Sequence, residues 1–390
     1  MKNFLIGLSL LIFVDLSVVG QVDSVGSIVI NNLDTLRFAT IQNRTLKIMP
    51  YVAPSYTPET EWLISGGGLI TFKTQNKDRL LNLSSIPFSV GYSSNGSFAV
   101  RAMHVIYWKG DNIRSFGEFQ WRDMPDNYWG VGYNKGNEVL KSDSTTAYSR
   151  RHWRFFQRLM FRTSKSFFVG LVVDLNQTMA FDLNPQMALD EDVLMAGTNV
   201  FNTGLGVILD YDTRDFVQNA YDGMYLSAAF TAYNPFWGGN SKFNIIDLDY
   251  RQYMMIRRAR RTLAWQVKTR FTFSGETPWT DKSMLGGLEN LRGYTIGRFR
   301  DDNMMIGTVE YRHMFKRRRL NKKGDYNSRF GYVAWLGAGT VAPSFDKITH
   351  ILPNGGVGFR FELQPKMNIR VDYGYAKGEN GVYVTFSEVF

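Results

Sequence analysis

Arg292 and Tyr294 are the residues of this chain whose setting most suggests chemistry. They lie in residues 285–300, LGGLENLRGYTIGRFR, where four glycines interrupt any helical or strand pattern. Glycine reaches backbone angles closed to other residues, so this composition predicts a tightly folded loop. A guanidinium forms planar, bidentate pairs with carboxylates, and it needs them where water is partly excluded. We therefore expect Arg292 to have acidic partners on neighbouring elements.

Glu310 is the first expected partner of Arg292. It alternates with the apolar Val309 and Tyr311 along the next predicted strand, so its side chain points to the polar side of that strand. Asp372 obeys the same alternation on a later strand and is the second candidate. We predict that these two carboxylates bind the arginine.

Alternating apolar and polar residues predict strands along most of the chain. In residues 262–273, apolar and aromatic side chains occupy one face, and glutamine, lysine, arginine and threonine occupy the other. Turn residues separate sixteen segments of this kind: 46–55, 62–73, 84–92, 97–107, 115–123, 145–159, 166–178, 199–210, 223–233, 243–256, 262–274, 303–314, 330–341, 355–363, 368–376 and 381–390.

This pattern predicts an all-β fold, a transmembrane antiparallel β-barrel. The composition, with 15% aromatic residues, 36 glycines and 11 prolines, suits many strands separated by turns. No later segment has the roughly 20 apolar residues of a spanning helix. An even number of strands about 10 residues long fits a barrel, whereas an open sheet of this size would curl or split. Short turns alternate with long connections, which places both chain ends in the periplasm and makes 285–300 an extracellular loop, the sixth.

The first twenty residues have the layout of a secretory signal peptide. Lys2 precedes an apolar run over 4–14, and small residues end at Gly20, which predicts cleavage before Gln21. We expect 1–20 to be the signal peptide, 21–45 a short periplasmic lead-in and 46–390 the barrel. The chain has no cysteine, so neither a disulfide nor lipid attachment at cysteine is available.

The net charge of +10 does not indicate nucleic acid, because an exported chain does not meet that partner. The basic residues gather in the predicted turns at 257–261 and 316–323, where they could face phospholipid headgroups or an acidic partner. The four histidines show no metal-ligand spacing, and there is no phosphate loop or nucleophile elbow. We expect no metal, cofactor or assigned catalytic residue, although spacing alone leaves open a Ser–His pair across strands.

The chain resembles the BamA/TamA superfamily of outer-membrane assembly and translocation proteins, also called the bacterial surface antigen family. The resemblance rests on Leu291-Arg292-Gly293-Tyr294 in the sixth long loop, and on segments 210–223, 355–374 and 387–390. It implies that this loop folds back into the lumen and that its tip binds inward-facing residues, here Glu310 and Asp372. It also implies that Phe386 and Phe390 form the C-terminal signal by which the assembly machinery recognises barrels.

Two departures from the family pattern stand out. Gly337-Ala338-Gly339 replaces an Asp-Ala-Gly sequence in the strand after the loop, so the arginine contact is expected to be weaker or rewired. The segment 21–45 is also too short for a periplasmic POTRA domain. The resemblance is therefore to a barrel-only branch of the superfamily, in which a partner would recognise the client.

The resemblance implies insertion or translocation of protein or lipid at the outer membrane, with the seam between 46–55 and 381–390 as the weak point. Expected partners are outer-membrane lipid, the assembly machinery during biogenesis, and a separate periplasmic or outer-membrane protein subunit. The alternative is a passive outer-membrane channel or structural subunit. A barrel enzyme is a third interpretation, which would require lipid hydrolysis abolished by one serine or histidine substitution.

Overall fold

The computed structural model describes residues 12–13, 46–57, 61–75, 81–217, 219–257, 260–316, 327–364, 367–386 and 388–390. The expected signal peptide and lead-in lie outside the described residues, apart from Ile12–Phe13. Within the described part, no helix has both the length and the apolar character needed to span a membrane.

Sixteen strands of eight or more residues occur in the described residues, which confirms the predicted all-β fold. The first of them, β2, begins at the residue predicted for it. The strands are β2 (Leu46–Thr57), β3 (Glu61–Phe72), β4 (Ser84–Ser93), β5 (Phe98–Trp108), β6 (Ile113–Asn127), β7 (Ala147–Arg162), β8 (Phe167–Phe181), β9 (Asn199–Asp212), β10 (Gly223–Tyr233), β11 (Phe243–Met255), β12 (Arg261–Gly275), β15 (Asn303–Lys316), β16 (Asn327–Ala342), β17 (Leu352–Gln364), β18 (Met367–Ala376) and β19 (Glu379–Phe386). Three shorter strands are β1 (Ile12–Phe13), β13 (Ser283–Leu285) and β14 (Phe299–Asp301).

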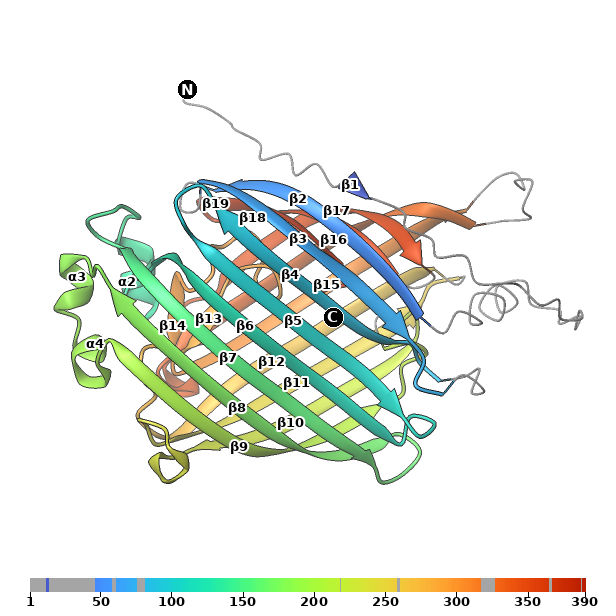
Figure 1. Cartoon of the computed structure of the whole chain (residues 1–390), viewed down its shortest axis with the longest axis horizontal. Helices are drawn as coiled ribbons and strands as arrows, with labels where there is room; N and C mark the ends of the chain where they lie inside the picture. Colours follow the sequence, from blue (N-terminus) through green and yellow to red (C-terminus); the bar gives the residue numbers. More distant parts are fainter. Residues whose placement is uncertain are drawn as a thin grey trace, which may run out of the picture. The chain divides into compact units, whose positions relative to one another are not determined.

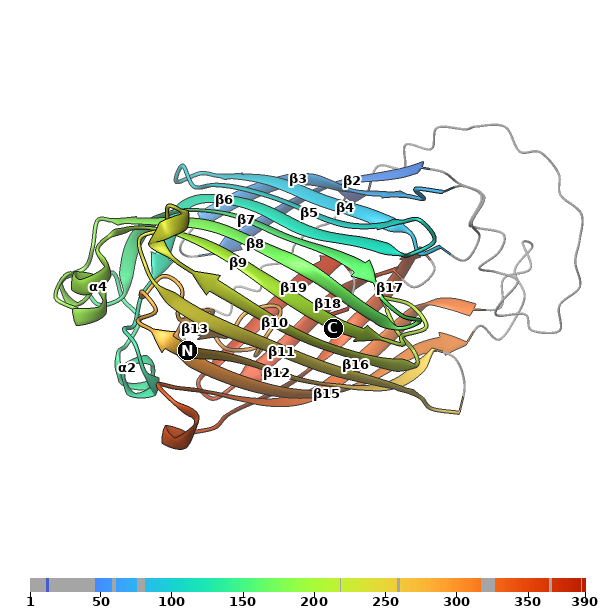
Figure 2. The same ribbon diagram turned by 90° about the horizontal axis from the view of Figure 1, so that it is seen from below.

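The chain divides into two compact units, residues 1–124 with 152–161, and residues 125–151 with 162–390. In the first unit, β2 to β6 pair in sequence order, each antiparallel to the next. In the second unit, β8 to β12 and β15 to β19 follow the same rule, and β12 pairs directly with β15 (Figures 1 and 2). Each strand is thus connected to its neighbour in the sheet, which is an up-and-down order.

The two faces of the strands differ as the alternation predicted. On β15, Val309 is 49% exposed and the neighbouring Glu310 is fully buried, and on β18 Tyr373 is 40% exposed while Asp372 is fully buried. The period of two in a strand separates these side chains onto opposite faces. One face of the second unit is therefore apolar and exposed, and the other is charged and covered by other parts of the unit.

The last strand is shorter than predicted. It ends at Phe386 instead of continuing to 390, and Glu388 and Phe390 leave the strand. The Arg312 guanidinium donates to the Phe390 carbonyl at 2.9 Å and lies 4.8 Å from the Phe390 ring, which also contacts Tyr253. The prediction that the last strand continues to 390 is therefore wrong, because these contacts hold the Phe390 ring in a buried cluster.

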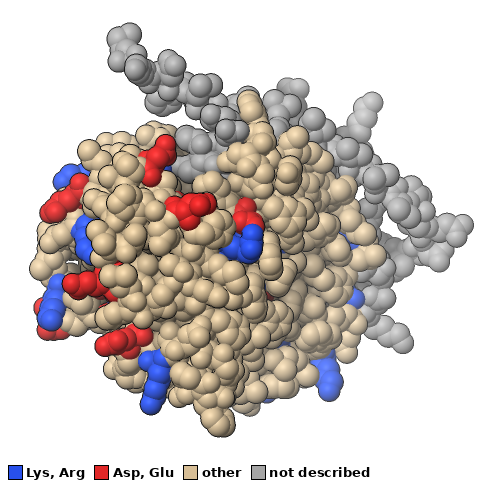
Figure 3. Space-filling model, turned by 60° about the vertical axis from the view of Figure 1, so that its left-hand side comes forward, with Lys and Arg blue, Asp and Glu red and all other residues tan. Residues whose placement is uncertain are grey.

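Short helices occupy the long connections of the second unit. They are α2 (Tyr133–Glu138), α3 (Pro185–Ala188), α4 (Glu191–Ala196), η1 (Pro235–Trp237) and η2 (Phe345–Lys347). Side chains cap three of them, because Asn184 accepts from the Met187 amide, Asp190 from the Asp192 amide and Asn234 from the Phe236 amide. On the face seen in Figure 3, acidic and basic side chains are interspersed and form no patch of one sign.

Candidate functional site

The loop that carries Arg292 is a hairpin with its own short sheet. Residues 276–302 connect β12 to β15, and within them β13 pairs with β14 so that Leu285 faces Phe299. Between these strands, the Gly287 amide donates to the Tyr294 carbonyl at 2.9 Å and the Gly297 amide to the Leu285 carbonyl at 3.0 Å. The glycine-rich stretch is therefore an ordered turn that presents residues 291–294 at its tip.

Arg292 lies between the two carboxylates that the alternation pointed to. Its Nη1 donates to Asp372 Oδ2 at 2.6 Å and its Nη2 donates to Glu310 Oε1. The Trp335 ring lies 3.7 Å from the centre of the guanidinium, a cation–π contact. All three charged side chains are at most 1% exposed, so the arginine is fully dehydrated and depends on these partners.

The Arg292 contacts continue into a larger buried ion network on β15, β17 and β18. Arg312 pairs with Glu310 at 2.9 Å, and Arg360 pairs with Asp372 at 2.5 Å and with Glu388 at 2.9 Å. Arg370 adds a longer contact of 3.5 Å to Asp372. Four guanidinium groups thus face three side-chain carboxylates. An isolated buried charge is costly, and each carboxylate here contacts at least two cationic or amide donors.

Glycine allows the loop tip to lie directly on β18. A Cβ at Gly374 would be 2.8 Å from the Arg292 carbonyl carbon and from the Gly293 nitrogen. Gly293 itself has φ +112° and lies equally close to the backbone of Tyr375 and Ala376. The Asn354 amide donates to the Arg292 carbonyl at 2.7 Å, so the backbone of the tip is also bound.

Apolar packing holds the loop beside the ion network. Leu285, Leu291, Tyr294 and Phe299 of the loop form one buried cluster with strand residues Met304, Ile306, Val341, Leu352 and Ala376. The Tyr294 hydroxyl donates to the Pro353 carbonyl at 3.2 Å. Burying this apolar area stabilises the docked loop independently of its charges.

A second set of polar contacts binds the loop to β19. Glu379 of β19 accepts from the Thr295 amide and pairs with Arg298, both at 2.6 Å. The Gly293 amide donates to the Tyr383 hydroxyl at 3.0 Å. The loop is therefore bound to β15, β17, β18 and β19 together.

The structure brings together Leu291, Arg292, Gly293, Tyr294, Glu310 and Asp372. It does not bring Phe390 to this point, since that ring packs with Tyr253, and the side chain of Phe386 lies outside the described part of the chain. Sequence reasoning missed Trp335, Arg360 and Glu379. Alternation could have placed Trp335 and Arg360 on the polar face, but Glu379 follows a turn and gives no such signal.

Docking of the loop is expected to depend on pH because of the carboxyl group of Asp301, at the end of β14. Burial raises the pKa of its carboxyl to about 6, against the hydrogen bond from the Asp302 amide and the charge of Lys282, which lower it. The negative charges of Asp302 and Asp192 add to the rise. The docked loop then holds a proton between about pH 4 and 6 that a released loop does not, so docking is fully stabilised below pH 4 and weakens as the pH rises through 6. We expect residues 276–302 to exchange amide hydrogens faster, after correction for intrinsic rates, at pH 7.5 than at pH 5.0.

Asp301→Asn, which keeps the uncharged form at every pH, should remove that difference, whereas Glu276→Gln at an exposed carboxylate should not. Equal corrected exchange at both pH values in the wild type would contradict the prediction.

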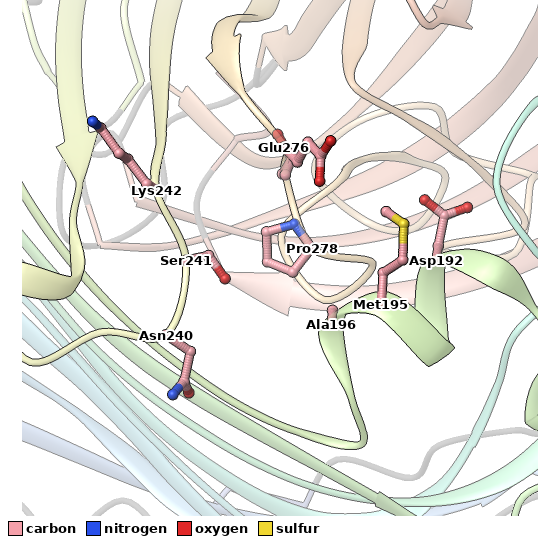
Figure 4. Close-up of a pocket in the computed structure, with 9 residues that line it drawn as sticks. Asp192, Met195, Ala196, Asn240, Ser241, Lys242, Glu276 and Pro278 are labelled. Atoms are coloured by element: carbon pink, nitrogen blue, oxygen red, sulfur yellow. The ribbon is translucent and has the colours of Figure 1, made fainter.

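A cavity of about 380 Å³ lies among the loops of the same unit. Its lining comes from α4 and the segments 240–242 and 276–278, and Figure 4 shows the Lys242 amino group pointing away from the Asp192 carboxylate. The residues that the structure describes contain no group of three or more side chains able to hold a metal ion. The cavity thus offers no aligned acid–base pair, and the arginine loop remains the candidate site.

Comparison with known proteins gives both a family and a fold. Residues 84–386 match the model of the Omp85 superfamily domain. Among solved structures, the chain is similar to BamA from Haemophilus ducreyi lacking POTRA domains 1–3, with 13% identity, a TM-score of 0.50, and coverage of 88% of this chain and 69% of that one. It is also similar to CdiB from Acinetobacter baumannii (14% identity, TM-score 0.50, coverage 88% and 59%) and from Escherichia coli (12%, 0.52, 87% and 61%).

These identities are low, so the structural likeness shows the fold alone, and the chain spans about 60% of the length of the CdiB chains. No curated protein matches by sequence.

Proposed function

Because the chain belongs to the Omp85 superfamily, we propose that it is an outer-membrane β-barrel acting in the insertion or translocation of protein or lipid. Members of this superfamily are β-barrels of the outer membrane. The observation that carries the proposal is the loop whose buried Arg292 binds Glu310 and Asp372 on the charged face of β15 and β18. A loop bound by side-chain ion pairs and hydrogen bonds can be released without unfolding the strands.

The exposed apolar face supports a lipid environment for the strands. Val309, Leu336, Val357 and Tyr375 are 49%, 75%, 60% and 62% exposed on four neighbouring strands. Contiguous apolar surface of this kind is rare on soluble monomers and is suited to acyl chains. The proposal therefore includes export by the signal peptide, contact with outer-membrane lipid, and the assembly machinery as a partner during biogenesis.

The loop gives this proposal a mechanism that makes and breaks no covalent bond. With Arg292 bound, the tip occupies the charged face of four strands; with Arg292 released, that face becomes free for a passing or inserting chain. Since the pairs are buried, release costs several kcal/mol and requires a client or a partner protein to compensate. A separate periplasmic or outer-membrane subunit is the expected source of client recognition.

The test is folding of a client barrel into phospholipid vesicles that contain this chain. We expect wild type to accelerate client folding about tenfold over empty vesicles, measured as the heat-sensitive electrophoretic mobility of the client. Glu310→Gln keeps the shape of the side chain but removes its charge, so it weakens the hold on Arg292. Because release of the loop is the step that the client must drive, the substitution should raise the rate above that of wild type.

Glu276→Gln, at an exposed carboxylate, is the matched control and should behave as wild type. A wild type that accelerates nothing and conducts ions steadily would replace the proposal with the alternative, a passive channel.

A further inference from the structure

Three polar side chains form a hydrogen-bonded group in the first unit. His104 Nε2 lies 2.7 Å from Ser115 Oγ, and Gln157 Nε2 donates to the same Oγ at 2.8 Å. Gln157 also donates to the Arg158 carbonyl at 2.9 Å, which fixes the amide. The residues come from β5, β6 and the part of β7 that belongs to this unit, and these strands run side by side (Figures 1 and 2).

This group lies on the apolar face of the strands, away from the charged one. His104 pairs across the strands with Gly117, in the same row of side chains where Ala102 pairs with Phe119. Phe119 is 40% exposed, as is Phe155, which lies two residues from Gln157 on the same face of β7. In the proposed membrane placement, on which this inference rests, this face touches lipid.

An unpaired polar side chain on a lipid-facing surface is costly, and polar groups in such positions are functional candidates by default. Here the three side chains are hydrogen-bonded to one another, and Gly117 leaves the space that they occupy. A Cβ at Gly117 would lie 2.3 Å from His104 Cε1 and 2.7 Å from Gln157 Oε1. Apolar side chains would fit this face without any such arrangement.

The geometry is that of a nucleophile and its base. Ser115 Oγ accepts from Gln157, which leaves its own proton free to be donated to His104 Nε2 in the tautomer protonated at Nδ1. A serine whose hydroxyl bonds to an imidazole is activated for attack on a carbonyl carbon. We propose that Ser115 and His104 cleave acyl esters of bilayer lipids, with Gln157 as a positioning residue.

The reaction balances with water as the second reactant. Ser115 Oγ attacks the ester carbonyl carbon while His104 Nε2 takes the hydroxyl proton, and this proton passes to the oxygen of the departing alcohol as the ester bond breaks. Water then attacks the acyl-serine, and His104 takes a proton from it. His104 returns that proton to Oγ as the fatty acid leaves. No oxidant or reductant is required.

The depth of the pair selects the ester of a glycerophospholipid. Ser115 is the third residue of β6, which follows the turn 109–112, so it lies about 7 Å from the strand end at roughly 3.3 Å per residue. With the short turns in the periplasm, this depth is where headgroup and acyl chain join. Phe119 and Phe155 continue along the strands as a surface for the acyl chain, next to the 5% exposed Ser115.

The test uses the full chain folded in vesicles of phosphatidylethanolamine and phosphatidylglycerol. A fluorophosphonate probe, which reacts with activated serines, should modify Ser115, as located by mass spectrometry, and the vesicles should release fatty acid. His104→Asn should lower the rate of probe reaction by about 100-fold or more, the usual contribution of a general base. Ser115→Ala should abolish fatty-acid release.

Matched controls come from a serine and a histidine with other partners. Ser149 bonds to Asp182, and His313 lies beside Tyr332, so Ser149→Ala and His313→Asn should keep wild-type rates. Heat-sensitive mobility shows whether each variant is folded. If a variant does not fold, the pH dependence of the probe reaction in wild type tests the proposal instead. The reaction rate should rise with pH as the His104 imidazole loses its proton. An unmodified Ser115 in folded wild type, or a rate unchanged by His104→Asn, overturns the proposal.

Discussion

Arg292→Ala is expected to release the loop tip and to lower the free energy of unfolding by about 3 kcal/mol. Removing one partner of a buried ion pair typically costs about 3–5 kcal/mol. The lower end applies here, because Asp372 keeps Arg360 and Glu310 keeps Arg312 as partners. The substitution also removes the charge that lies over the Trp335 ring.

Two measurements check this expectation. Urea unfolding, followed by heat-sensitive mobility, gives the loss of stability, and single-channel recording shows whether the loop obstructs conduction. We expect a quiet wild type and a conducting Arg292→Ala. Arg292→Lys keeps the charge, but lysine has no planar group that binds both carboxylates at once. The stability of Arg292→Lys should therefore lie between that of wild type and that of Arg292→Ala. If Arg292→Ala has wild-type stability and conductance, the buried pairs do not hold the loop.

The identity of the carboxylates near Arg292 could be read from the sequence because the period of two in a strand is exact enough to assign a face. Alternation placed Glu310 and Asp372 on the polar face, and the family resemblance brought the loop to that face, so both were named over sequence separations of 18 and 80 residues. Alternation says nothing, however, about height along a strand or about which strand a returning loop reaches. Trp335 beneath the guanidinium depends on both, and so it was not predicted.

The path of residues 388–390 was mispredicted for a related reason. The alternation of Val382 and Val384 continues to Phe386 and beyond, which predicted a longer strand. The ion pair between Arg360 and Glu388 joins distant residues and cannot be inferred from a local pattern. The buried ion pair of Glu388 with Arg360, together with the hydrogen bond from the Asn368 side chain, outweighs the continuation of the strand. Long-range ion pairs of this kind override local strand propensity.

The departure at Gly337 is explained by the space around it. At Gly337, where the resemblance led us to expect aspartate, a Cβ would lie 2.5 Å from Asn354 Oδ1 and 3.0 Å from Thr308 Oγ1. A carboxylate does not fit there unless Asn354 moves. Asn354 instead binds the Arg292 carbonyl, and Asp372 with Glu310 supplies the negative charge. Arg292 is thus bound from β15 and β18, and Gly337 contributes no charge.

Gly374→Ala is expected to displace the loop tip while leaving every charged residue in place. The new Cβ would stand 2.8 Å from the Arg292 carbonyl carbon and the Gly293 nitrogen, closer than real Cβ contacts. Both atoms belong to the backbone, so no side-chain rotation relieves the clash, and overpacking of this kind costs about 1–3 kcal/mol. A tip shifted away from β18 also lengthens the contacts from Arg292 to both carboxylates.

Gly307→Ala on β15 is the matched control, because a Cβ there meets nothing within 4 Å. Both substitutions reduce the entropy of the unfolded chain equally, so the difference between them isolates the clash with the loop. Amide hydrogen exchange of residues 286–298 should be about tenfold faster in Gly374→Ala and unchanged in Gly307→Ala. Equal exchange in the two variants would mean that the tip does not rest on β18, and the ion pairs of Arg292 would then have to bind the loop without that contact.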